Sequence, residues 1–260
     1  MLRSIDPGMV MGTPSSAEQS LAGGLPASAI QAVELWPENL AYLKASGLGP
    51  GSGEELMAHF KSLNTRFGVL FDLRGAGGED LKSACVLAGL ARPPQEPIFI
   101  LTNNRGVALE TNLVSGVFAR FPLLMILVDG ETSGASEALV SVLKGGAGVM
   151  LVGTPTSGGA SLRDWLLLPG GRTVWLTTRK WKLASGHPPE DGGIRPDIRV
   201  AANSGIWNEG LSRTNLTNRA LSVKSDSDKD LMMRVSGDAA LQRATDILLG
   251  IQAVDGYERN

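Results

Sequence analysis

Short apolar runs alternate with amphipathic stretches along the middle of the chain, from residue 68 to residue 152. Each apolar run is only a few residues long, which is typical of a buried strand and too short for a membrane span. The stretches between these runs place apolar residues at helical spacing. The predicted strands are Val69–Leu73, Pro97–Leu101, Leu123–Val128 and Val149–Val152, and the predicted helices are Asp80–Leu90, Leu109–Phe121 and the segment that follows Ser133. Strands that alternate with helices predict βαβ units and a mainly parallel sheet.

The most informative stretch is Leu123–Gly145, where a strand leads into a helix through a sharp turn. The turn is Asp129-Gly130-Glu131, and Thr132 or Ser133 can cap the helix that follows it. The apolar positions of this helix fall on one face, at Ala135, Ala138, Leu139, Val142 and Leu143. A helix N-terminus directs backbone N–H groups and a dipole toward whatever lies in front of it. The arrangement can therefore hold an oxyanion, a phosphate or a nucleophilic serine.

The chain before residue 68 divides into an extension and a further strand-and-helix region. Residues 1–28 are small, polar and rich in Pro and Gly, which predicts a weakly ordered extension. Ala32–Leu35 and Leu40–Leu43 alternate in polarity and predict two short strands or a hairpin. A helix follows, in which Ser52 and Glu55 have the spacing of a capping box. Its predicted buried stripe consists of Leu56, Met57, Phe60 and Leu63.

The pattern changes after residue 152. Asp164–Leu168 and Thr173–Thr178 flank a Pro-Gly-Gly-Arg turn and predict a β-hairpin. Residues 201–235 are polar and without a regular pattern, whereas Ala239–Val254 predicts an amphipathic closing helix. We therefore expect an extension over residues 1–28, a core over residues 29–200, and a C-terminal segment over residues 201–260 that includes the packing helix.

Composition narrows the choice of partners and compartments. Hydrophobic residues make up 43% of the chain and charged residues 19%, as in ordinary globular proteins. A net charge of −2 and a pI near 5.8 argue against nucleic acid as a partner. No apolar run is long enough to cross a bilayer, and the N-terminal residues lack the apolar core of a signal peptide. The protein is then either cytosolic or a mature fragment.

Residue types that bind metals or carry redox chemistry are scarce. The single cysteine, Cys85, excludes an intramolecular disulfide, and its place on an apolar helix face predicts a buried, inert thiol. The two histidines, His59 and His187, are far apart in the sequence, and His59 is expected at a helix surface or core edge. The glycines of residues 75–78 do not have the G-x-G-x-x-G spacing of a dinucleotide site. We expect neither a metal nor a cofactor.

A series of short motifs follows the predicted turns in a fixed order. They read D-L-R-G-x-G-G, A-S-E, V-G-x-P-T-x-G, L-T-T, and S-G followed by I-x-P-D. Their positions are Asp72–Gly78, Ala135–Glu137, Val152–Gly158, Leu176–Thr178, Ser185-Gly186 and Ile194–Asp197. Over about residues 30–200 the chain resembles the tail-specific, or carboxy-terminal processing, serine proteases. The resemblance implies an α/β fold with a Clp/crotonase-like βαβ spiral core, here with a β-hairpin insertion and a C-terminal helix.

The resemblance also implies a mechanism and the positions that would carry it. In that family a serine at the helix start attacks the peptide carbonyl, a buried lysine accepts its proton, and backbone N–H groups stabilise the oxyanion. Aligned on Ala135, the nucleophile position is Gly134 and the lysine position is Gly159. The oxyanion and peptide-binding side matches Gly77, Gly78 and the N–H of Ala135. Both dyad positions are therefore glycine, while the cradle for the carbonyl is expected to remain.

Other polar residues of these motifs are expected to be scaffold. Asp72 and Arg74 are expected to hold the glycine-rich loop by hydrogen bonds, and Glu137 to bond loop backbone near the helix start. Arg163 occupies the position of a glutamine that often follows the family lysine. The PDZ domain that usually precedes the core in that family is not visible, and its members are usually exported. The resemblance therefore implies a periplasmic or extracytoplasmic location.

Three functions are consistent with this sequence. The first is a peptidase-like domain that has lost its dyad and binds extended polypeptide. The second is an active serine endopeptidase that uses Ser133 or Ser136 with an unidentified base. Lys180 and Lys182, which follow the hairpin turn, are candidates for that base. Against it, neighbouring helix residues point about 100° apart, so neither serine replaces a hydroxyl at position 134. The third is a crotonase-like acyl-thioester enzyme, which we rank last because the motifs are those of the proteases. The substrate and the oligomeric state stay open.

Overall fold

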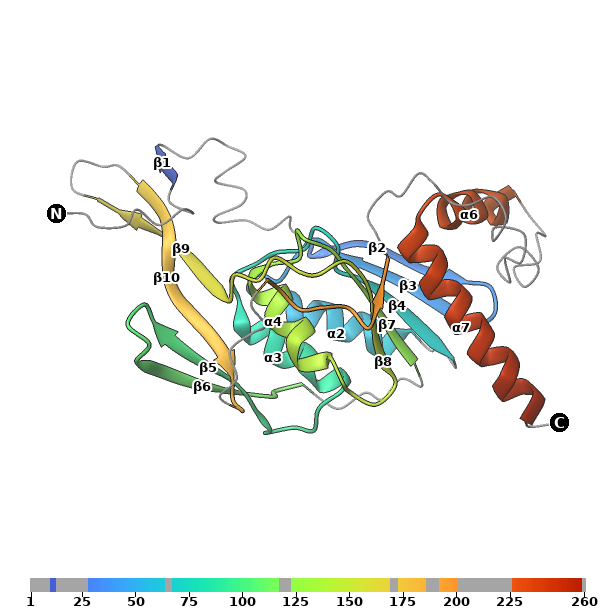
Figure 1. Ribbon diagram of the computed structural model, residues 1–260, viewed down its shortest axis with the longest axis horizontal. Helices are drawn as coiled ribbons and strands as arrows, with labels where there is room; N and C mark the ends of the chain where they lie inside the picture. Colours follow the sequence, from blue (N-terminus) through green and yellow to red (C-terminus); the bar gives the residue numbers. More distant parts are fainter. Residues whose placement is uncertain are drawn as a thin grey trace.

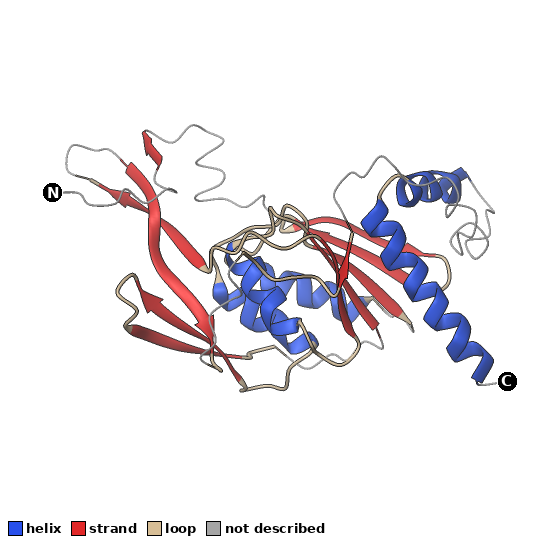
Figure 2. Cartoon of the chain, in the orientation of Figure 1, coloured by secondary structure: helices blue, strands red, loops and turns tan. Residues whose placement is uncertain are grey.

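The structure is a computed structural model that describes residues 10–12, 28–63, 67–116, 123–168, 173–185, 192–200 and 226–258. Its described residues form two β-sheets, with helices between the sheets and further helices on the outer face of the larger sheet (Figures 1 and 2). The α/β fold with a parallel core is the one expected from the sequence. None of the helices in this part of the chain is long and apolar enough to span a membrane.

The larger sheet has six strands and is mostly parallel. The strands β3, β4, β7, β8 and β11 run parallel, which confirms the sheet that the βαβ alternation predicts. Only β2 is antiparallel, and it pairs with β3 as the predicted hairpin. In spatial order the strands are β11 (Ile198–Arg199), β8 (Val149–Gly153), β7 (Leu123–Val128), β4 (Gly68–Asp72), β3 (Leu40–Ala45) and β2 (Ile30–Trp36). Because helices cover both faces, the central strands can be almost wholly apolar.

Helices α2 (Ser52–Ser62), α3 (Leu81–Leu87) and α4 (Gly134–Leu143) lie between the sheets, and a 3₁₀ turn, Ala88–Leu90, continues α3. Their apolar stripes are buried as the helical spacing predicts. Cys85 of α3 is buried in the same cluster, and burial raises the pKa of its thiol to about 12. On the outer face, α6 (Asp226–Ser236) and α7 (Ala239–Glu258) pack on the sheet through the buried side chains of Val235, Leu241, Ala244 and Leu248.

The smaller sheet is antiparallel and extends away from the helices (Figure 1). Its strands are β1 (Val10–Gly12), β10 (Thr173–Leu183), β5 (Pro97–Asn103), β6 (Ala108–Leu113) and β9 (Ser161–Leu167), the last of which pairs with β10. The β9–β10 pair is the predicted hairpin, whose turn at residues 169–172 lies outside the described residues. Trp181 near the end of β10 packs on Phe99 of β5, so this end of the hairpin belongs to the core.

Several secondary-structure predictions are wrong. Where the helix over Leu109–Phe121 was expected to begin, the chain forms strand β6, because pairing with β5 outweighs the helical spacing of a segment that is mostly exposed. Residues 117–121 of that expected helix lie outside the described residues. Pro97–Leu101 is a strand, but it belongs to the antiparallel sheet. Residues from Asp226 onward form α6 where an irregular segment was expected, and Val10–Gly12 of the expected extension form β1. The remainder of residues 1–27 and residues 201–225 lie outside the described residues, and the three-part division of the chain stays a prediction.

The capping box predicted for α2 does not form. Gly51, with φ of 80°, is the N-cap residue, and no side chain caps the helix. Ser52 Oγ donates instead to the carbonyl of Gly49 at 2.8 Å. Glu55 accepts from the hydroxyl of Ser28 and the N–H of Ala29, so it fastens the strand region to the helix. Glu55, which was expected to cap its own helix, thus joins that helix to a segment more than 25 residues earlier in the chain.

Candidate functional site

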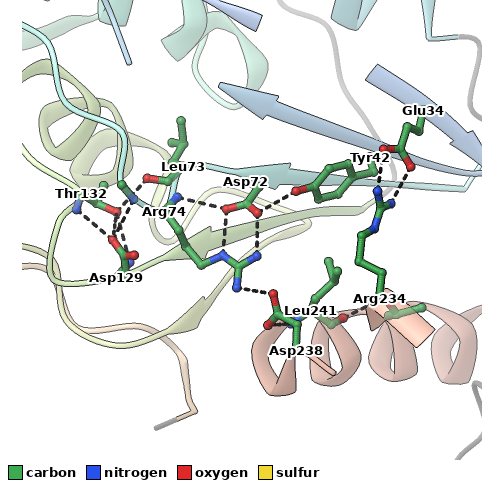
Figure 3. A network of polar contacts seen from close by, with 12 residues as sticks. Glu34, Tyr42, Asp72, Leu73, Arg74, Asp129, Thr132, Arg234, Asp238 and Leu241 are labelled. Atoms are coloured by element: carbon green, nitrogen blue, oxygen red, sulfur yellow. Dashed lines mark hydrogen bonds and ion pairs between the residues drawn. The ribbon is translucent and has the colours of Figure 1, made fainter. Parts of the chain in front are cut away.

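The candidate site lies where the loops after β4 and β7 meet. These strands are parallel neighbours, so their carboxyl ends lie side by side. We call residues 73–79, which follow β4, the glycine loop. Thr132 joins the two loops: its hydroxyl donates to the Leu73 carbonyl at 2.9 Å and accepts from the Asp129 N–H at 3.1 Å (Figure 3). The N–H of Gly75 donates to Asp129 Oδ1 at 3.0 Å. Thr132 and Asp129 of the loop after β7 therefore each bind the glycine loop directly.

The glycine loop lies directly on the N-terminus of α4. The N–H of Ala135 donates to the carbonyl of Gly78 at 2.7 Å. Ser136 Oγ donates to the carbonyl of Gly77 at 2.6 Å. The structure thus brings together Gly77, Gly78 and Ala135, as the sequence predicts. The amide of Ala135, however, is engaged with a carbonyl of the chain itself, which satisfies a group that a helix start otherwise leaves open.

Gly134, the position that the resemblance assigns to the nucleophile, has no room for a side chain. Its φ is 56°, a left-handed conformation that residues with a Cβ rarely adopt. A Cβ built on it would lie 2.2 Å from the carbonyl oxygen of Gly78. The Gly78 carbonyl oxygen therefore accepts the hydrogen bond of the Ala135 amide and also fills the space that the Cβ of a serine at residue 134 would need.

The two candidate serines beside Gly134 have different surroundings. Ser136 is fully buried and its hydroxyl is committed to the glycine loop. Ser133 is half-buried and is the N-cap residue of α4, with its N–H donating to the Ala76 carbonyl at 3.0 Å. Within the described part of the chain its hydroxyl has no hydrogen-bonding partner, and it makes no capping bond. Side-chain capping of α4 by Thr132 or Ser133 was predicted and is wrong, because Thr132 bonds across to the glycine loop instead.

Glu137 is buried in the first turn of α4 and holds the loop that follows β8. Its Oε1 accepts from Thr156 Oγ1 at 2.5 Å and from the N–H of Gly158 at 2.6 Å. Thr156 Oγ1 in turn accepts from the N–H of Ile194 at 2.8 Å. The scaffold role expected of Glu137 is confirmed. The sequence did not single out Thr156, although its place in the V-G-x-P-T-x-G motif was a usable signal.

Gly159, the position assigned to the lysine, contrasts with Gly134. The nearest atom to a Cβ built on it is Ser161 Oγ, at 3.3 Å, so a side chain is not blocked by backbone there. Lys180 and Lys182 lie on β10, where Lys180 is opposite Ser161 of β9 and Thr102 of β5. Neither lysine makes an ion pair or hydrogen bond through its side chain to another described residue.

A buried carboxylate anchors the base of the glycine loop. Asp72, at the end of β4, is fully buried and accepts from Arg74 Nε at 2.9 Å and Nη2 at 2.7 Å, and from the Tyr42 hydroxyl at 2.8 Å (Figure 3). Burial acts to raise the pKa of Asp72, but the hydrogen bonds and charge of Arg74 lower that pKa below its ordinary value. The loop-holding role expected of Asp72 and Arg74 is confirmed.

The same network continues to the C-terminal helices. Arg74 Nη1 pairs with Asp238, between α6 and α7, at 2.6 Å. Arg234 of α6 lies over the rings of Trp36 and Tyr42 and contacts both carboxylate oxygens of Glu34, at 2.8 and 2.5 Å (Figure 3). These partners are remote in the sequence, and no local pattern points to them.

Glu79 closes the far end of the glycine loop. Its Oε2 accepts from the N–H of Arg163 on β9 at 2.7 Å. Burial raises the pKa of Glu79 to about 7, although the bond from Arg163 and its charge act in the opposite direction. Among the described residues, no group of three His, Cys, Asp or Glu side chains is placed to hold a metal ion.

Comparisons with known proteins agree with the resemblance. Residues 39–200 match the profile of peptidase family S41. The carboxyl-terminal-processing protease of a Picosynechococcus strain is 26% identical over 162 residues, which is 62% of this chain and 39% of the relative. The carboxy-terminal processing protease of Bacillus subtilis is 24% identical over 169 residues, or 64% of this chain and 36% of the relative. The chain thus spans well under half the length of these curated relatives.

Solved structures show the same fold at low sequence identity. A candidate S41 protease from Bacteroides fragilis superposes with a TM-score of 0.60 at 18% identity, covering 87% of this chain and 59% of the other. The photosystem II D1 C-terminal processing protease gives 0.52 at 21% identity, covering 67% of this chain and 46% of the other. Since the family profile matches more than half of the chain, the chain belongs to peptidase family S41.

Proposed function

We propose that this S41 chain binds extended polypeptide and does not hydrolyse it. One observation carries the loss of hydrolysis: the Gly78 carbonyl lies 2.7 Å from the Ala135 amide, and 2.2 Å from where a Cβ on Gly134 would be. A serine peptidase needs a nucleophile in the second of these places and a free N–H donor in the first. Here one carbonyl of the chain occupies both.

The neighbouring serines support the same proposal. Ser136 is buried and donates to Gly77, so its hydroxyl has neither access to a substrate nor a base. Ser133 is more accessible, but no described lysine, histidine or carboxylate accepts its proton. Nucleophilic catalysis by serine requires such a partner within hydrogen-bonding distance. Membership of S41 also favours the two peptidase-derived hypotheses over the crotonase-like one.

Polypeptide as the ligand rests on the family and on the retained scaffold. The relatives are named as processing peptidases and proteases, a class of enzyme that acts on polypeptide. Asp72, Arg74 and Glu137 still hold the loops around the site by the bonds described above. A scaffold that keeps this order without a dyad is suited to binding rather than to cleavage.

Casein, which is unstructured, tests both halves of the proposal. Fluorescently labelled casein is incubated with the wild type and with Ser133→Ala, binding is followed by anisotropy, and cleavage by gel electrophoresis. We expect binding without cleavage, and the same binding in Ser133→Ala. Cleavage by the wild type that Ser133→Ala abolishes would establish the alternative of an active endopeptidase. Absence of binding would contradict the polypeptide half.

A further inference from the structure

The β9–β10 hairpin has one face that is not used by the core. Arg163, Trp165 and Leu167 alternate along β9 and therefore point to one side of the sheet. The cross-strand pairs Trp165–Trp175 and Ser161–Lys180 add Trp175 and Lys180 to that side, and Lys182 follows two residues later. The opposite side carries Leu162 and Trp181, which are buried in the core. We call the first side the outer face, consisting of Arg163, Trp165, Leu167, Trp175, Lys180 and Lys182.

The outer face combines exposed cations with apolar and aromatic surface. Arg163 and Lys180 are exposed, and Leu167 is 73% exposed. The rings of Trp165 and Trp175 lie against each other, with centroids 5.3 Å apart, and both residues are half-buried. A half-buried cross-strand tryptophan pair beside cations is a surface on which planar or apolar groups can stack.

The charges of the hairpin are separated between its two sides. The one acidic residue of the hairpin, Asp164, points away from the outer face. On the opposite side it accepts from the Thr178 hydroxyl and pairs with Arg179 at 3.1 Å. Lys180 and Lys182 have no described carboxylate as a partner. Over residues 161–183 the sequence has three arginines and two lysines against one aspartate, while the whole chain has a net charge of −2. A positive surface on a weakly acidic protein attracts an acidic ligand locally.

One carboxylate already binds at the rim of this face. Glu79 of the glycine loop accepts from the backbone N–H of Arg163 at 2.7 Å. The contact places a carboxylate beside the backbone of β9, at the end nearest the candidate site. It also places the outer face next to the glycine loop without making it part of the α4 site.

We propose that the outer face docks an acidic polypeptide segment that contains aromatic residues. Carboxylates of the segment pair with Arg163, Lys180 and Lys182, and its aromatic rings pack on Trp165, Trp175 and Leu167. Nucleic acid fits less well, because a protein that binds it commonly neutralises about 6–10 phosphates, and this face has three cations. The proposal concerns a surface apart from the glycine loop and stands whether or not the chain retains catalysis.

The test uses the full chain and a fluorescein-labelled random copolymer of glutamate and tyrosine. Binding is measured by anisotropy at low salt, with the double variant Lys180→Glu/Lys182→Glu and, as a matched control, Lys61→Glu/Lys82→Glu. The control changes the same number of charges at exposed lysines of α2 and α3. We expect the outer-face variant to weaken binding about tenfold, and the control to leave it nearly unchanged. Circular dichroism confirms that both variants are folded.

Trp175→Ala separates stacking from charge. It is expected to weaken binding of the glutamate–tyrosine copolymer and to leave the weaker binding of poly-glutamate unchanged. Equal weakening by the two double variants would overturn the proposal, since the attraction would then be spread over the whole chain. No binding of the copolymer, or tighter binding of oligo-dT or of phosphatidylglycerol vesicles through the same lysines, would overturn it as well. Casein binding with an unresponsive outer face would leave the proposed function standing and refute only this inference.

Discussion

Replacing Gly134 by alanine tests the closed geometry of the candidate site directly. An alanine there has to adopt a φ near 56° and has to displace the Gly78 carbonyl, which would lie 2.2 Å from the new Cβ. Gly145, at the other end of α4, is the matched control. Its φ is 76°, and a Cβ built on it has no atom within 4 Å. Both substitutions introduce the same backbone strain, and only Gly134→Ala introduces the collision.

The expected magnitudes follow from these two contributions. A non-glycine residue in the left-handed region costs about 1 kcal/mol, and this applies to both variants. At Gly134 the glycine loop also has to retreat by about 1 Å in a closely packed region. This movement breaks the Ala135–Gly78 hydrogen bond, at about 1 kcal/mol, and strains the buried Ser136–Gly77 bond by a comparable amount. We expect Gly134→Ala to lower the free energy of unfolding by about 3 kcal/mol and Gly145→Ala by about 1 kcal/mol.

Urea denaturation followed by circular dichroism measures the difference, provided that the slope with urea is the same in both variants. A difference of about 2 kcal/mol supports the closed geometry. Equal losses in the two variants would refute the reasoning, because the Gly78 carbonyl would then not occupy the space beside Gly134.

Three further predictions concern the residues around this site. Restoring both dyad positions, as Gly134→Ser/Gly159→Lys, is expected to give a less stable protein without peptidase activity on casein, because the serine side chain collides with the glycine loop; activity in this variant would contradict the closure. Since burial raises the pKa of Glu79 from 4.5 to about 7, the folded chain keeps a proton that the unfolded chain releases, and stability falls as the pH rises through that range. Glu79→Gln should remove roughly 1–2 kcal/mol of the stability change between pH 5 and pH 8, after allowance for partial exposure, and identical pH dependence in wild type and variant would exclude this assignment. Arg234→Ala should cost about 1–2 kcal/mol of stability through lost contacts with Glu34, Trp36 and Tyr42, against no more than about 0.5 for Arg243→Ala on the exposed side of α7, and equal melting temperatures would contradict it.

Hydrophobic periodicity predicts the parallel core because both faces of that sheet are buried. The apolar run at Leu123–Val128 has no polar position, and Val69–Leu73 has only Asp72, so neither run shows the alternation of a strand with one exposed face. The prediction of a helix beginning at Leu109 is wrong for the converse reason, as strand β6 (Ala108–Leu113) shows. Most of its side chains are exposed, so their apolar spacing does not report burial, and the segment is a strand because β5 pairs with it.

The sequence predicts which residues make up the candidate site, but it does not predict that the Gly78 carbonyl closes it. The resemblance assigns the dyad positions to Gly134 and Gly159, and the motifs predict that Gly77, Gly78 and Ala135 lie close together, as they do. The direction of the Gly78 carbonyl depends on the φ and ψ angles of several loop residues, which no motif fixes. The ion pair that anchors this loop could not be predicted from local sequence patterns either, because Arg74 and its partner Asp238 are 164 residues apart in the sequence.

Intact-mass spectrometry after treatment with a fluorophosphonate is the most direct test of the loss of the nucleophile. The reagent forms a covalent bond with an activated serine hydroxyl and leaves unactivated serines unmodified. We predict that the folded wild-type chain keeps its unmodified mass under conditions in which an active serine peptidase is fully labelled. A single adduct, mapped to Ser133 or Ser136 and absent after unfolding of the protein, would contradict the account.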